Sequence, residues 1–264
     1  MSCSILKNAK KENINLEYFP YIIINDALDE ELYKKLSEEY PTLDLMIKSQ
    51  PKVRDRTNNK RIDINSLNIK NNNLVSDNWQ KFINYHISNE FWLEILELFK
   101  DKILELHPNI EERIGCKLEE LKTHMRYSKK TEKKEMEMEC QISMNTQVNK
   151  TCSVRGTHVD FPDKLYVGLF YMRSEEDNSI GGDLEIFKVK NQKEFYNLKN
   201  APKKYKSFSS NLVEKVNTIK YKKNCLVFFI NCNHAVHAVS PRQPTKHIRR
   251  FVNFVGGLGD IKLF

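Results

Sequence analysis

The chain has 264 residues, of which 40% are hydrophobic and 30% are charged. This composition supplies enough apolar side chains for a buried core and excludes wholesale disorder. The longest apolar runs, 21–24 and 225–230, are far shorter than the roughly 20 residues that span a bilayer. The N-terminus lacks the apolar segment of a signal peptide. We therefore expect a cytoplasmic protein without a membrane partner.

The six cysteines are scattered and form no C-x-x-C pair. This spacing fits reduced thiols better than a disulfide framework or a zinc ribbon. We interpret all six as structural.

The net charge of +8 is concentrated in one segment, because residues 188–223 hold 11 Lys and 2 Glu. The lysines there alternate with aromatic residues at 195, 196, 205, 208 and 221. Positive charge with stacking surfaces suits an acidic or phosphorylated substrate, such as a nucleotide, a nucleotide sugar or a nucleic acid. Solvated lysines are the simpler explanation.

The first half of the chain has mainly helical patterns. A short strand at 18–24 precedes a helix that starts at Asp29 and stops before Pro41, and helical spacing of apolar residues returns at 79–86 and 89–107. A weaker helix is expected over 110–122. Residues 48–78 read as a polar loop, and the charge-balanced segment 128–139 as a solvated loop or exposed helix.

The second half has the pattern of a β protein. Seven of the eight glycines follow residue 155, and short β-branched or aromatic runs alternate with Gly, Asn, Asp and Pro. The expected strands are 152–160, 165–173, 183–189, 212–221, 224–230, 235–239 and 249–255. Many short strands after a helical segment predict a β-sandwich or barrel supported by helices.

A candidate metal site lies in Thr157-His-Val-Asp-Phe-Pro162. On an extended chain, His158 and Asp160 project to the same face and can share one metal ion. His237 follows the apolar strand 225–230. Two imidazoles and one carboxylate form the facial triad that leaves positions open on non-haem Fe(II).

Two alternatives to this triad involve the neighbours of His237. His234 could replace His237 as the ligand. Cys225, Cys232, His234 and His237 could instead form a zinc site, although the Cys232-x-His234 spacing is too tight for usual zinc sites.

The order of motifs resembles the 2-oxoglutarate- and Fe(II)-dependent oxygenases, particularly their prolyl-hydroxylase-like branch. The matching blocks are His158-Val-Asp-Phe-Pro, Gly-Leu-Phe-Tyr-Met-Arg173, Gly181-Gly-Asp-Leu-Glu-Ile-Phe187, His237-Ala-Val-Ser-Pro and Arg249-Arg-Phe-Val-Asn-Phe254. The resemblance implies an α+β fold with a double-stranded β-helix, or jelly-roll, core. It also implies that His158, Asp160 and His237 bind iron.

The resemblance further implies a basic residue that pairs with the distal carboxylate of 2-oxoglutarate, and a tyrosine hydroxyl, here Tyr171, on the same carboxylate. Arg249 and Arg250 both qualify, but neighbouring strand residues face opposite ways, so one of them points inward. We favour Arg249, which shares its face with Asn253. If neither arginine acts, Lys164 or Lys246 is the next candidate.

The sequence therefore predicts one oxygenase domain over residues 1–264, with a helical buttress over about 1–122 and a jelly-roll core over about 123–264. The expected reaction uses Fe(II), 2-oxoglutarate and O2, hydroxylates an unidentified substrate, and releases succinate and CO2. A peptidyl prolyl hydroxylase and a non-catalytic metal-binding module are the alternatives.

Overall fold

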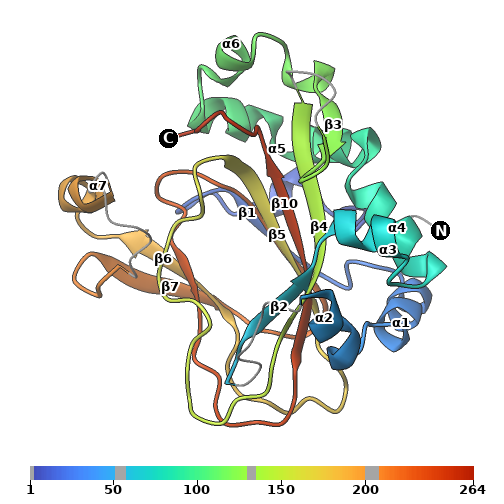
Figure 1. The fold of residues 1–264 in the computed structure, drawn as a ribbon. Helices are drawn as coiled ribbons and strands as arrows, with labels where there is room; N and C mark the ends of the chain where they lie inside the picture. The colour runs from blue at the N-terminus through green and yellow to red at the C-terminus, as the bar shows by residue number, and fades with distance from the viewer. Residues whose placement is uncertain (1–2, 51–57, 130–134, 200–207) are drawn as a thin grey trace.

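A computed structural model describes residues 3–50, 58–129, 135–199 and 208–264, with the side chains of 196–199 excepted (Figure 1). It shows a mixed α+β fold. Its strands are β1 (Tyr21–Asn25), β2 (Arg61–Ile64), β3 (Lys122–Met125), β4 (Glu135–Asn145), β5 (Lys164–Met172), β6 (Leu184–Val189), β7 (Val213–Ile219), β8 (Lys223–Ile230), β9 (His237–Val239) and β10 (Arg249–Gly257). Its α-helices are α1 (Glu30–Glu38), α2 (Leu43–Ser49), α3 (Ser66–Asn72), α4 (Asp77–His86), α5 (Asn89–Leu106), α6 (Ile110–Ile114) and α7 (Gln192–Lys199).

The strands form two sheets. The larger sheet has seven strands, six of them in the order β1-β8-β5-β10-β4-β2, with β3 paired to β4. The smaller sheet has three strands in the order β7-β6-β9. Within the described chain, strand pairing is antiparallel except between β3 and β4. Strands β1 and β2 belong to the larger sheet, so the N-terminal part supplies strands as well as helices.

One face of the larger sheet is covered by helices (Figure 1). Helices α4 and α5 start where the Ser76 and Ser88 hydroxyls accept hydrogen bonds from the backbone N–H groups of Trp79 and Phe91. Their apolar stripes pack on the outward side chains of β4, β5, β8 and β10. The helices expected at 79–86 and 89–107 are thus confirmed.

The other face of the larger sheet packs against the smaller sheet. Leu184 and Ile186 of β6 share a buried cluster with Val167, Val227 and Phe229 of the larger sheet. Because side chains alternate along a strand, β1, β5, β8 and β10 contribute buried residues to both cores. The site described below lies between the two sheets.

Three expectations for the polar segments were wrong. Residues 48–78 contain β2 and α3 besides loop, and residues 51–57 lie outside the described chain. The helix expected over 110–122 is interrupted: α6 ends at Ile114, Gly115 follows with a left-handed φ of 77°, and a short 3-10 helix covers Leu118–Glu120. Part of 128–139 belongs to β4, where Met136 and Met138 are fully buried; residues 130–134 lie outside the described chain.

The strand expected over 152–160 was also wrong. The segment forms isolated bridges, Cys152 with Arg242 and His158 with His237, and no continuous strand. The other expected strands of the second half are present with ends shifted by up to two residues. None of the described helices has the length and apolarity needed to cross a membrane.

Candidate metal centre and anion pocket

His158, Asp160 and His237 come together between the two sheets. One ligand atom from each residue can be chosen so that all three lie within 4.8 Å of one another. His237 Nε2 is 3.5 Å from Asp160 Oδ2, and the two imidazole centroids are 4.3 Å apart. Within the described parts of the chain, this is the one group of three or more His, Cys, Asp or Glu residues arranged to hold a metal ion.

Backbone pairing positions the two histidines. The N–H of His158 donates to the carbonyl of His237, and the N–H of His237 donates back, both at 2.9 Å. This bridge joins the segment before β5 to the first residue of β9. The juxtaposition therefore depends on a long-range backbone contact as well as on the local H-x-D spacing.

Each imidazole is oriented by a second contact. His158 Nδ1 is 2.8 Å from the carbonyl oxygen of Gly156, and His237 Nδ1 is 3.0 Å from that of Ala235. A carbonyl oxygen only accepts, so Nδ1 carries the proton in both rings. The lone pair is then on Nε2, as in histidine ligands that donate their other N–H to a carbonyl.

The electrostatics of the site keep both histidines neutral and the aspartate ionised. Burial and the neighbouring His237 lower the pKa of His158 to about 3. Burial also lowers the pKa of His237, and Asp160 partly opposes that shift. For Asp160, burial opposes ionisation, but Lys164 and the two histidines hold its pKa below its ordinary value. At neutral pH the group is two neutral imidazoles and one carboxylate.

Lys164 pairs directly with this group. Its Nζ lies 2.7 Å from Asp160 Oδ1, at the start of β5. The contact occupies one carboxylate oxygen and leaves Oδ2 on the side of His237. Lys164 therefore lies beside the candidate metal centre.

The three residues open onto a pocket of about 310 Å³. One part of its lining is apolar and comes from Val167, Leu169, Leu184, Val239 and Phe251. The cationic part consists of four side chains: Arg61, Arg155, Lys164 and Arg249. Asp160 is the one carboxylate residue in the described lining. The pocket is therefore suited to anions.

Arg249 is the deepest of these cations, with 2% of its surface exposed. Its Nε donates to the carbonyl oxygen of Gly182 at 2.8 Å, and its Nη1 donates to Asn145 Oδ1 at 3.2 Å. Arg249 Nη2 and Asn145 Nδ2 are buried donors without a hydrogen-bond partner in the described structure. No described carboxylate lies within 4 Å of this guanidinium, and a buried charge is costly unless it is paired.

Tyr171 lies next to Arg249. Its side chain is fully buried, and its hydroxyl has no hydrogen-bond partner in the described structure. The Arg249 guanidinium carbon is 5.0 Å from its ring centroid. Burial raises the pKa of Tyr171 to about 12, so the hydroxyl is a neutral donor. Arg249, Asn145 and Tyr171 thus supply three buried donors in one region.

Arg250 points the other way. Its guanidinium donates to the Met172 carbonyl and to the carbonyl and hydroxyl of Ser37 on α1, at 3.0 to 3.2 Å. It packs over the Tyr40 ring on the helical side of the sheet. Arg250 and Lys246 are both absent from the pocket lining, whereas Lys164 is part of it.

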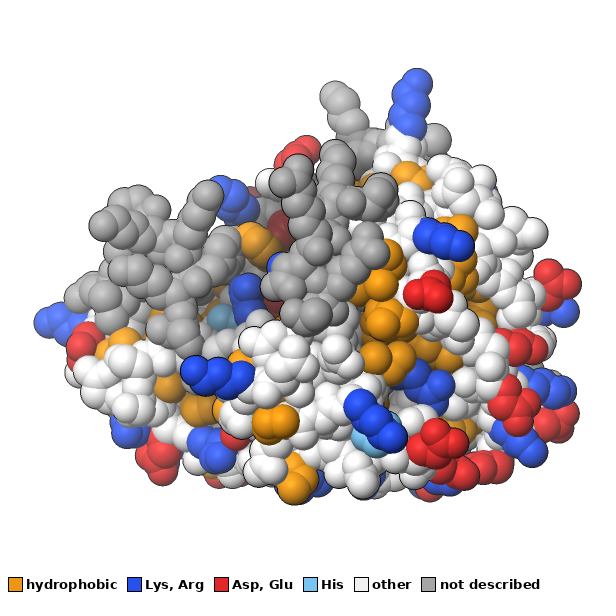
Figure 2. Space-filling model, turned by 60° about the horizontal axis from the view of Figure 1, so that its bottom comes forward, with side chains coloured by type: hydrophobic (Ala, Val, Ile, Leu, Met, Phe, Trp, Pro, Cys, Tyr) orange, Lys and Arg blue, Asp and Glu red, His pale blue; other side chains and the backbone are white. Residues whose placement is uncertain are grey.

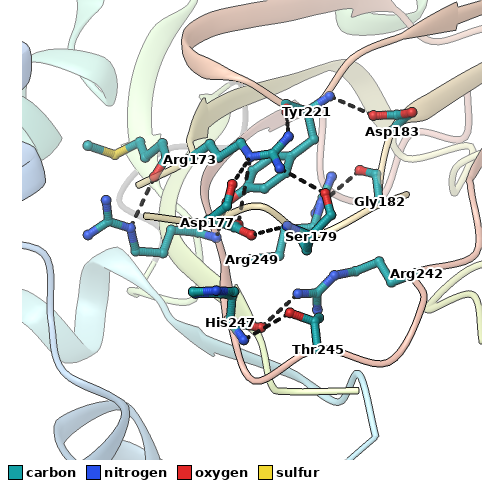
Figure 3. Close-up of polar contacts among 12 residues, drawn as sticks. Arg173, Asp177, Ser179, Gly182, Asp183, Tyr221, Arg242, Thr245, His247 and Arg249 are labelled. Carbon is teal, nitrogen blue, oxygen red and sulfur yellow. Dashed lines mark hydrogen bonds and ion pairs between the residues drawn. The ribbon is translucent and has the colours of Figure 1, made fainter. Parts of the chain in front are cut away.

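The connection between β5 and β6 contains Gly182, whose carbonyl accepts the hydrogen bond from Arg249 (Figure 3). Arg173 donates to the carbonyls of Asp177, Ser179 and Tyr221 at 2.8 to 3.1 Å. Gly182, further along, has a φ of 80°, and a Cβ there would lie 3.0 Å from Arg249 Cδ. The contact between Gly182 and Arg249 was not predicted from the sequence.

The alternatives around His237 do not share this geometry. His234 lines a different pocket, and its Nδ1 lies 2.7 Å from Asn233 Oδ1. Cys225 and Cys232 are buried in the apolar cluster between the sheets. These residues form no metal-binding group among the described residues.

Part of the positive charge of segment 188–223 is paired with acidic residues within the described chain. Ion pairs of 3.0 to 3.4 Å join four of its lysines to acidic residues: Lys188 to Glu214, Lys215 to Glu185, Lys220 to Asp183 and Lys223 to Glu175. Phe195 and Tyr221 are buried and cannot offer stacking surfaces. Residues 200–207 lie outside the described chain. On the face shown in Figure 2, acidic and basic side chains are interspersed.

The comparisons with known proteins bear on the fold. No protein-family model matches the sequence, and no curated protein is significantly similar to it. The chain is similar to the crystal structure of a prolyl 4-hydroxylase from Phytophthora capsici, with a TM-score of 0.54 and 13% identity over 97% of this chain and 65% of that chain. The chain has the fold of this prolyl 4-hydroxylase.

The chain spans about two thirds, 65%, of the length of that prolyl 4-hydroxylase. Two further structures match with lower TM-scores: a Pseudomonas putida prolyl-4-hydroxylase (0.46, 12% identity, 92% of this chain and 94% of that chain) and a Trichoplax adhaerens prolyl hydroxylase in complex with a peptide fragment (0.44, 11% identity, 96% and 90%). The resemblance predicted from the motifs is confirmed for the fold. In this prolyl 4-hydroxylase-like fold, the candidate triad and Arg249 face one pocket between the sheets.

Proposed function

We propose that the protein is an Fe(II)- and 2-oxoglutarate-dependent dioxygenase that hydroxylates a substrate and releases succinate and CO2. One observation carries the proposal. Two neutral imidazoles and a carboxylate converge on the same pocket as a buried guanidinium that has no carboxylate partner in the described structure. A ligand set for Fe(II) and a receptor for a dicarboxylate therefore lie side by side.

The donor set fits a ferrous ion. Two histidine nitrogens and one carboxylate oxygen leave coordination positions open, as non-haem Fe(II) oxygenases require. In the proposed assignment His158, Asp160 and His237 bind the metal. Their pKa shifts keep all three in the ligating protonation state at neutral pH.

The buried donors fit the distal carboxylate of 2-oxoglutarate. In the proposed assignment Arg249 supplies the charge, Tyr171 and Asn145 supply hydrogen bonds, and Gly182 holds the guanidinium in place. Guanidinium binds a carboxylate through two parallel hydrogen bonds, which fixes its orientation. The apolar side chains of Leu169, Leu184 and Phe251 line the same pocket and exclude water from the carbon chain.

The bound metal and cosubstrate supply the difficult chemistry, in which O2 and 2-oxoglutarate give CO2, succinate and one oxygen atom for a substrate C–H bond. The protein contributes binding, orientation and the exclusion of water. Lys164 holds one oxygen of Asp160, so the other oxygen faces the metal position.

In the proposed organisation residues 1–264 act as one unit. Residues 123–264 supply most strands of a jelly-roll core made of the two facing sheets, and residues 1–122 add β1 and β2 to it and cover its helical side. The packing of Leu184 and Ile186 on the larger sheet supports this arrangement. The prolyl 4-hydroxylase fold of the neighbour makes proline-containing peptides one substrate class to test.

The test uses 2-oxoglutarate labelled at carbon 1, with Fe(II), O2 and a panel of metabolites and proline-containing peptides. It measures the release of labelled CO2. We expect slow release without a substrate, faster release with one panel member, and none from Asp160→Ala. A protein that binds Fe(II) but never releases CO2 would support the non-catalytic metal-binding module instead.

A further inference from the structure

Besides Arg249, the pocket lining contains Arg61 and Arg155, which the proposed metal and cosubstrate sites do not use. Arg61 of β2 lies opposite Asn145 of β4, which lies opposite Arg249 of β10. Residues directly opposite each other in antiparallel strands share a face, so both arginines face the pocket. Their guanidinium carbons lie 5.2 Å (Arg61) and 4.7 Å (Arg249) from the ring centroid of Phe251.

The two arginines differ in depth. Arg249 is buried, whereas 37% of the Arg61 side chain is exposed. The buried Arg249 suits a cosubstrate that binds first and is then enclosed. The more exposed Arg61 is accessible to a substrate that binds afterwards.

Arg61 is held in a fixed orientation. Its Nε is 2.8 Å from Asp63 Oδ1, and its Nη2 makes longer contacts of 3.4 Å with Gln141 Oε1 and Ser143 Oγ. Asn253 Nδ2 donates to the same Gln141 oxygen at 3.1 Å. These residues form a polar wall from β2 across β4 to β10. A preorganised guanidinium loses little side-chain entropy when a ligand binds.

The charge of the pocket favours an anion at this wall. Fe(II), Asp160, 2-oxoglutarate and Arg249 together are neutral, and Asp63 balances Arg61. Lys164 then adds a positive charge beside the metal position, and Arg155 is the fourth cation of the lining. Without a negative group on the substrate, the charge of Lys164 would stay uncompensated in this sum.

We propose that Arg61 binds an anionic group of the substrate, a carboxylate or a phosphate, and holds the rest of the substrate between Phe251 and the metal centre. This inference rests on the proposed function. It names the substrate as an anion and Arg61 as a specificity-determining residue. Residues 48–78 were predicted as a polar loop, so this role of Arg61 was not predicted.

The test uses inorganic phosphate and acetate as probes of protein loaded with Fe(II) and 2-oxoglutarate under nitrogen. Calorimetric titration should show that the wild type binds at least one of them, and the stronger probe identifies phosphate or carboxylate as the preferred group. Arg61→Met should weaken this binding at least about 10-fold, and Arg61→Lys should weaken it less. Arg113→Met, which removes an arginine of α6 outside the pocket, should bind like the wild type.

Two results would overturn the inference: no binding of either anion by the loaded wild type, or equal binding by the wild type and a folded Arg61→Met. A third would reassign the residue, because a loss of 2-oxoglutarate affinity in Arg61→Met as large as in Arg249→Met would place Arg61 in the cosubstrate site. The visible absorption band of the Fe(II)–2-oxoglutarate complex reports the proposed function separately. Its absence in the wild type contradicts that function, whereas anion binding tests Arg61.

Discussion

The side chain of Arg249 is fixed by the backbone of Gly182, whose carbonyl oxygen accepts a hydrogen bond of 2.8 Å from Arg249 Nε. The contact joins the start of β10 to the connection between β5 and β6, which Arg173 anchors (Figure 3). It uses one edge of the guanidinium and leaves Nη2 without a partner in the described structure. The position of the proposed carboxylate receptor therefore depends on a glycine far from it in sequence.

Replacing Gly182 with alanine should weaken 2-oxoglutarate binding. The residue has a φ of 80°, and the added Cβ would lie 3.0 Å from Arg249 Cδ and 3.2 Å from Arg242 Cδ. We expect a loss of about 10-fold in affinity, with Fe(II) binding retained. Gly115→Ala is the matched control, since Gly115 has a φ of 77° at the end of α6. It should lower the free energy of unfolding and leave 2-oxoglutarate affinity unchanged; equal effects of the two variants would contradict the account.

The two adjacent arginines should separate cosubstrate binding from stability. Arg249→Met should cost about 2–5 kcal/mol of 2-oxoglutarate binding, or roughly 30-fold to several thousand-fold in affinity. Arg250→Met should leave that affinity within a few-fold but lower the free energy of unfolding by about 1–3 kcal/mol, because it removes contacts with Ser37 and Met172. Cosubstrate titration and urea unfolding measure the two effects. The reverse ranking in affinity would exchange the roles.

The candidate ligands should be separable from their nearest alternative by metal analysis. His158→Ala, Asp160→Ala and His237→Ala should each abolish stoichiometric Fe(II) binding, because two protein donors remain on an ion that exchanges water. His234→Ala should keep the metal, since His234 lines a different pocket. Loss of iron in His234→Ala with retention in His237→Ala would show that the distal ligand is misassigned.

Acid should destabilise the protein partly through a histidine far from the metal centre. His86 lies among Phe82, Phe91 and Phe254, and burial lowers its pKa to about 3. Its unfolded-state pKa is about 6.5, so between these values the unfolded chain binds the additional proton. The free energy of unfolding should therefore fall as pH decreases from about 6.5 towards 3, by up to about 1.4 kcal/mol per pH unit for this group.

Urea unfolding at several pH values measures this slope. His86→Phe lacks the titrating group and should show a smaller slope over the same range. An identical slope in the variant and the wild type would mean that His86 is not the residue that takes up the proton.

The sequence predicted the elements whose patterns have a single explanation. Helices α4 and α5 carry long apolar stripes with capping residues, and β5, β8 and β10 are apolar or alternating runs bounded by turn residues. The alternation along β10 also predicted that Arg249 and Arg250 face opposite sides of the sheet, as they do.

The elements that were not predicted depend on contacts between residues far apart in the sequence, which a local sequence pattern does not reveal. Strand β2 has buried residues at Ile62 and Ile64, but four residues within a polar segment are too short to stand out. In β4 the buried methionines Met136 and Met138 alternate with charged residues, which resembles an exposed segment. Arg61 and Asn145 reach the pocket through sheet register, and Gly182 contacts Arg249 through loop packing, so their roles could not be predicted from spacing.

The most direct test of the central claim is anaerobic visible absorption of the protein with Fe(II) and 2-oxoglutarate. A 2-oxo acid that chelates ferrous iron gives a weak charge-transfer band, and Zn(II), with its filled d shell, gives none. We predict that the wild type shows the band, that Asp160→Ala shows none, and that Arg249→Met shows it only at much higher 2-oxoglutarate concentrations. A protein that binds Fe(II) stoichiometrically through an intact triad but never shows the band would contradict the assignment of this pocket to 2-oxoglutarate.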